Sequence, residues 1–156
     1  MSTFAVSKVA EISRCGYPAP MDEPCRGRHT RRLGDVAGLT QFGVNQVRLE
    51  PGAWSSQRHW HTHEDEFVQV ISGEVTLVMD GGETVMRPGD CAGFRAGVED
   101  GHHLVNRSNS DCVFLAIGTR IDADGAEYPD IDMKALPERY DRPGTGTFVH
   151  KDGTPY

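Results

Sequence analysis

Residues 52–73 read GAWSSQRHWHTHEDEFVQVISG, and this stretch gathers several potential metal ligands in one short segment. Alternate side chains of an extended strand point to the same face. His59 and His61 therefore share a face, with His63 as a third candidate at the same spacing, and Glu66 can add a carboxylate from the next strand. Imidazole suits Zn, Fe, Ni and Cu, and a carboxylate extends the choice towards Mn. The segment predicts one divalent metal ion.

A second segment, residues 88–106, reads PGDCAGFRAGVEDGHHLVN and brings a further pair of histidines. His102 shares a strand face with Leu104 and Asn106, whereas His103 points to the other face. The alternation favours His102 as the fourth ligand and leaves His103 as the alternative.

The two segments together resemble the two motifs of the cupin family. The first motif is H-x-H, three or four residues, Glu, six residues and Gly, which this chain matches from His59 to Gly73. The second ends in His, three residues and Asn, which matches His102 and Asn106; Arg95 replaces its usual proline. The resemblance implies a metal ion, Zn, Mn, Fe or Ni, on three histidines and one glutamate, namely His59, His61, Glu66 and His102.

The cupin spacing also bears on His63. A His61–His63 pair would leave only two residues before Glu66, which is too short for the motif. We therefore interpret His63 as a histidine at the rim of the site, where it is a candidate proton carrier, with Glu64 as a second.

The remaining pattern predicts an all-β fold. Short β-branched or apolar runs alternate with Gly and Pro turns, and EVTLVMD-GG-ETVMR at residues 74–87 is typical of a tight hairpin. Many strands without intervening helices indicate a sandwich or barrel. With the motif resemblance, we expect a cupin double-stranded β-helix, or jelly-roll barrel, at residues 42–120. Residues 1–41 are expected to form an N-terminal arm, and residues 121–156 a loop-rich extension packed on the same domain.

Composition restricts the partners. The net charge is −7, which argues against nucleic acid, and no apolar stretch approaches the roughly 20 residues of a membrane span. The four cysteines form no C-x-x-C motif, and the N-terminus shows no secretory signal, so we expect a cytoplasmic protein with reduced thiols. Edge strands and the arm need cover, which predicts a homodimer.

Three functions remain open. The first is an enzyme, of isomerase or lyase type, whose metal acts as a Lewis acid on a small sugar-like or carboxylate substrate. The second is an iron-dependent dioxygenase, and the third is a non-catalytic module that binds a small molecule. Arg58 and Arg95 flank the motifs, so each can hold an anionic substrate or form a surface ion pair. The resemblance to small bacterial cupins called sugar-phosphate-isomerase-like favours the first function.

Overall fold

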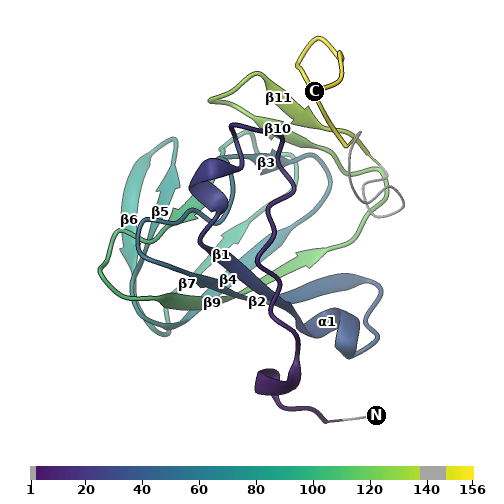
Figure 1. Ribbon diagram of the computed structural model, residues 1–156. Helices are drawn as coiled ribbons and strands as arrows, with labels where there is room; N and C mark the ends of the chain where they lie inside the picture. Colours follow the sequence, from purple (N-terminus) through teal and green to yellow (C-terminus); the bar gives the residue numbers. More distant parts are fainter. Residues whose placement is uncertain (1–2, 138–146) are drawn as a thin grey trace.

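The computed structural model describes residues 3–137 and 147–156, and short strands are the main regular secondary structure of this part of the chain (Figure 1). None of the helices it describes has the length and apolarity that a membrane span requires. The helical elements are two 3₁₀ turns, Val6–Lys8 and Glu23–Cys25, and α1, Leu33–Val36. The strands are β1 Arg28–Arg32, β2 Phe42–Leu49, β3 Trp60–His61, β4 Glu66–Ser72, β5 Val75–Met79, β6 Gly82–Met86, β7 Cys91–Phe94, β8 His103–Val105, β9 Cys112–Thr119, β10 Ala126–Tyr128, β11 Met133–Ala135 and β12 Phe148–Val149.

These strands form three antiparallel sheets. The largest has the order β1-β2-β9-β4-β7, a second has β6-β5-β8, and a third has β12-β11-β10-β3. In Figure 1 the β5–β6 hairpin lies on one side of the five-stranded sheet, and β3, β10 and β11 lie together at one end of the molecule. The prediction of an all-β fold is confirmed.

Apolar side chains from the first two sheets form the main core. Phe114 of β9 and Leu49 of β2 are almost completely buried, as is Val75 of β5. They belong to one cluster, whose other members come from the same three strands and from β4, β6, β8 and the loop after β2. Burial of a side chain of this size stabilises the fold by about 1.5–3 kcal/mol. The cluster therefore fixes β4, which begins at Glu66, and β8, which directly follows His102.

The predicted hairpin is confirmed, with its turn one residue earlier than the sequence pattern suggested. Met79 pairs with Gly82, so Asp80 and Gly81 connect the strands and Gly82 already belongs to β6. The glycine that ends the first motif, Gly73, has φ +75°, and a Cβ there would lie 2.5 Å from the Asp111 carbonyl oxygen. Any other residue would strain this turn.

The three expected parts of the chain are joined by hydrogen-bonded strands. β1, within residues 1–41, pairs with β2 along its whole length. β10, within residues 121–156, pairs with β3 and so with the first motif. Both terminal segments thus contribute strands to the sheets, and the division of the chain at residues 42 and 121 stays a prediction.

Candidate metal centre

Direct backbone pairing holds the two histidine motifs together. The His59 N–H donates to the His102 carbonyl oxygen at 3.2 Å, and the His102 N–H donates to the His59 carbonyl oxygen at 2.8 Å. His61 lies in β3, which β10 holds through the pair Ala126–His61. Glu66 opens β4, where it is paired with both β7 and β9. Segments far apart in the sequence therefore set the positions of the four side chains.

The four side chains converge on one carboxylate oxygen. Glu66 Oε2 lies 2.8 Å from His102 Nε2, 3.4 Å from His61 Nε2 and 3.8 Å from His59 Nε2. The Nε2 atoms of His59 and His61 are 3.2 Å apart. His59, His61 and Glu66 form the compact group, with ligand atoms all within 4.8 Å of one another, and His102 joins it through Glu66.

Hydrogen bonds on the far side of two rings fix which nitrogen faces the cluster. His59 Nδ1 lies 2.9 Å from the Gln57 carbonyl oxygen, and His61 Nδ1 lies 2.8 Å from Asp124 Oδ2. Both oxygens only accept, so each Nδ1 carries the proton and each Nε2 directs a lone pair towards Glu66. Lone pairs and a carboxylate at this separation repel one another unless a cation lies between them. The donor set therefore fits a divalent metal.

Burial and hydrogen bonding set the charge states of the cluster. Burial lowers the pKa of His59 to about 3, although Glu66 opposes the shift. Burial alone would raise the pKa of Glu66, but the hydrogen bond with His102, together with the neighbouring imidazole rings, outweighs it and holds that pKa well below the usual carboxyl range. At neutral pH a neutral His59 ring thus faces an ionised Glu66, which are the forms that bind metals.

Comparison with known proteins places the chain in a family. A sugar phosphate isomerase of the cupin superfamily from Silicibacter pomeroyi DSS-3 is 42% identical, with a TM-score of 0.88, and the match covers 99% of this chain and 96% of that one. The chain belongs to the cupin superfamily. The cupin domain profile matches residues 45–118, and a search of curated proteins found no match.

Other cupin structures agree with this assignment. A proposed sugar phosphate isomerase from Acidithiobacillus ferrooxidans is 31% identical over 84% of this cupin and 82% of that chain, with a TM-score of 0.72. A polyketide cyclase from Streptomyces resistomycificus, 22% identical over 76% and 79% of the two chains with a TM-score of 0.61, shares the fold. The jelly-roll type predicted from the motifs is confirmed.

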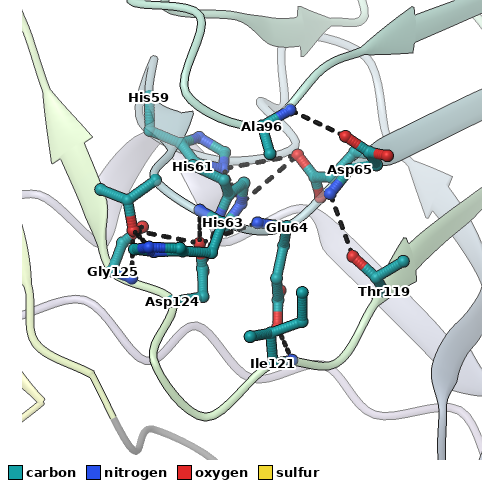
Figure 2. Close-up of polar contacts among 12 residues, drawn as sticks. His59, His61, His63, Glu64, Asp65, Ala96, Thr119, Ile121, Asp124 and Gly125 are labelled. Atoms are coloured by element: carbon teal, nitrogen blue, oxygen red, sulfur yellow. Dashed lines mark hydrogen bonds and ion pairs between the residues drawn. The ribbon is translucent and has the colours of Figure 1, made fainter.

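Asp124 is a site residue that the sequence analysis missed. It is completely buried beneath His61, and its Oδ1 accepts the backbone N–H groups of His63 at 2.8 Å and Glu64 at 3.1 Å (Figure 2). The carboxylate thereby holds both the His61 ring and the backbone that follows it. Such a partner raises the basicity of a metal-binding histidine and fixes its orientation. Asp124 lies in an acidic loop with no local motif, so no sequence signal marked it.

The two adjacent histidines of this cupin have different surroundings. The His102 ring stacks on Phe94, with centroids 3.6 Å apart, and reaches Glu66. His103 is also buried, but its Nδ1 lies 3.0 Å from the Ser56 carbonyl oxygen and its ring meets Trp54 edge-on at 4.6 Å. The geometry places His102, and not His103, with the other candidate ligands.

His63 and Glu64, the two candidate proton carriers, have different surroundings. His63 is exposed, lies 2.8 Å from the Thr62 hydroxyl through Nδ1, and lines neither of the two cavities beside the cluster. Glu64 is 3% exposed, lines both cavities, and its Oε1 accepts the Ile121 N–H at 2.8 Å. The chain leaves the strand after His61, so alternation no longer applies at His63.

The flanking arginines lie away from the main cavity. Arg58 Nη2 and Nε bind the two carboxylate oxygens of Asp130 at 2.6 and 2.7 Å, and Nη1 contacts Asp80. These bonds raise the pKa of Arg58, with the Asp130 bonds contributing most. Arg95 is exposed and lines a smaller cavity of about 210 Å³. The ion-pair alternative for Arg58 is confirmed, and neither arginine lines the main cavity of about 600 Å³.

Proposed function

We propose that this cupin is a metal-dependent enzyme of isomerase or lyase type that acts on a small, oxygenated, sugar-like substrate. The observation that carries the proposal is the convergence of three imidazoles on Glu66 in a cavity of about 600 Å³, a size typical of small-molecule sites. The sugar phosphate isomerase from Silicibacter pomeroyi, matched over almost the whole chain, supports the isomerase class.

In this proposal His59, His61, Glu66 and His102 hold the metal, which would act as a Lewis acid on a carbonyl or hydroxyl oxygen of the substrate. Proton transfer in either reaction class needs a titratable group beside the substrate. Glu64 meets this requirement better than His63, because its carboxyl group is buried and lines the cavity that contains the cluster. Its bond from the Ile121 N–H fixes one oxygen in place.

Metal analysis of protein purified without added metal tests the proposal. We expect about one equivalent of zinc, manganese or nickel per chain, and aldose–ketose interconversion of sugar phosphates by the metal-loaded protein, followed by NMR. The matched control is His103→Ala, which should retain the metal. Absence of any bound metal would overturn the proposal, and iron together with oxygen consumption would favour the dioxygenase alternative.

We also propose that this cupin is a homodimer. Phe67 and Ile71 of β4 are apolar side chains that are 41% and 45% exposed, on the sheet face opposite the core. Light scattering should give twice the chain mass of 17.1 kDa at micromolar concentration. Phe67→Glu should shift the population towards the monomer, whereas Val36→Glu, at an exposed apolar residue of α1, should not. A wild-type mass of one chain would contradict the proposal.

A further inference from the structure

One wall of the main cavity is cationic, although the chain as a whole is acidic. β1 places the alternate residues Arg28, Thr30 and Arg32 on this wall. Arg31, between them, points to the opposite face, where it pairs with Glu11 at 2.9 Å. A strand that reads RHTRR thus divides its charges between a solvent-side ion-pair network and the cavity.

Arg28 differs from Arg32 and Arg120, which also line the cavity and pair with Asp35, in having no acidic partner among the described residues. Its Nη1 donates to the Ser55 carbonyl at 2.7 Å and its Nη2 to the Arg14 carbonyl at 3.4 Å. Its Nε is buried and has no hydrogen-bond partner, and no carboxylate oxygen of residues 3–137 or 147–156 lies within 4.0 Å of its guanidinium. Arg120, by contrast, pairs with Asp35 at 2.6 Å.

The cavity is lined by charges of both signs. Glu64 and Glu66 belong to the candidate metal centre, and the third lining carboxylate, Asp35, pairs with Arg120. Arg28 belongs to β1, and Arg14 belongs to the segment that is bridged to β1. A guanidinium always carries its charge, and a planar fork of donors matches the oxygens of a phosphate or a carboxylate. A partly buried arginine with a free donor gains more from such an anion than an exposed one does, because water screens the pair less.

We propose that the substrate of this cupin carries an oxyanion group, a phosphate or a carboxylate, which binds Arg28 while the oxygenated part of the substrate reaches the metal centre. Anion binding at Arg28 does not depend on the proposed function; only the contact between the substrate and the metal centre does. It assigns anion binding to Arg28 in place of Arg58, whose donors already bind Asp130 and Asp80.

The Cys15 thiol is another group that can bear negative charge near Arg28. A hydrogen bond from Cys25 lowers the pKa of Cys15 to about 6 against the effect of burial, and the charge of Arg28 contributes a smaller part. A thiolate here would share the guanidinium with a bound anion. Cys15→Ser therefore belongs in the test, and its anion affinity should equal or exceed that of the wild type.

Inorganic phosphate and acetate are suitable probes, because neither depends on the length of a sugar chain. Binding is measured by calorimetry and thermal shift on the metal-loaded protein at constant ionic strength, with glycerol as the neutral control. We expect at least one of the two anions to bind and glycerol not to bind. Arg28→Gln should lower the affinity for that anion at least tenfold. Arg28→Lys should lower it by a smaller factor, because lysine keeps the positive charge but lacks the planar pair of donors. Arg31→Gln, on the opposite face of the same strand, should bind like the wild type.

The outcomes separate the sources of the anion and the two proposals. Binding of phosphate alone indicates a phosphorylated substrate, and binding of acetate alone a carboxylate. Unchanged affinity in both Arg28 variants, or binding of neither anion to the wild type, would overturn the inference. Loss of anion affinity in Cys15→Ser equal to that in Arg28→Gln would overturn it as well. If the protein binds no metal, and phosphate affinity is lost only in the Arg28 variants, the proposed function is refuted and the inference stands.

Discussion

Replacing His61 by alanine is expected to lower metal affinity at least tenfold, a loss of about 1.4 kcal/mol in binding free energy. His61 Nε2 is close to two other candidate ligand atoms, 3.2 Å from His59 Nε2 and 3.4 Å from Glu66 Oε2, so its removal takes one ligand from a compact group. His102→Ala should have an effect of the same kind, because it removes the ring that lies 2.8 Å from Glu66. Metal content after dialysis against a graded chelator measures both losses.

His103→Ala is the matched control, since it deletes an equally buried imidazole from the neighbouring position. Its ring is held by Trp54 and the Ser56 carbonyl, and its loss should lower thermal stability while leaving metal content close to that of the wild type. If His103→Ala loses the metal and His102→Ala keeps it, the metal ligand of the second motif is His103 and not His102. Unchanged metal in His61→Ala would reject the site.

The sequence was sufficient to predict the strands that contain many apolar residues. The longer strands β2, β4, β5 and β9 lie where β-branched and apolar runs predicted them, because their burial drives their formation. β1 was not predicted, because its sequence RHTRR has no apolar face. It is a strand because it pairs with β2 and because its alternate charges meet Glu11 on one side and the cavity on the other.

The residues of the candidate site that lie within short sequence motifs could be predicted, whereas those that lie outside the motifs could not. Strand alternation brought His59 and His61 to one side, and the structure places Glu66 and His102 beside them. His63 shows the limit of that reasoning, because an alternation argument fails where the strand ends, and β3 ends at His61. The neighbouring Glu64 enters the cavity instead.

Asp124 could not be predicted, because the interaction that defines it joins residues 63 positions apart. Its loop, IDADGAEYPDID, contains several aspartates that look alike in the sequence. Only the pairing of β10 with β3 brings this one beneath His61. The segment expected to be a loop-rich extension thus supplies a carboxylate that holds His61 of the candidate metal centre.

Replacing Asp124 by alanine is therefore expected to damage both the metal centre and the fold. His61 loses the acceptor that keeps its proton on Nδ1, and loss of such a partner lowers metal affinity by about 10–100-fold. The backbone N–H groups of His63 and Glu64 lose their acceptor, and each buried donor left unsatisfied costs about 1–3 kcal/mol.

Chelator competition and thermal unfolding measure these two losses separately, and Asp122→Ala, at an exposed aspartate of the same loop, is the control that should change neither. Asp124→Asn sharpens the test. An amide can accept from the two backbone N–H groups through its oxygen, but its NH₂ group then faces His61 Nδ1 and cannot accept that proton. The asparagine variant should regain much of the lost stability and little of the metal affinity. Recovery of both would show that Asp124 acts on the fold alone, because an orienting role for His61 requires the carboxylate.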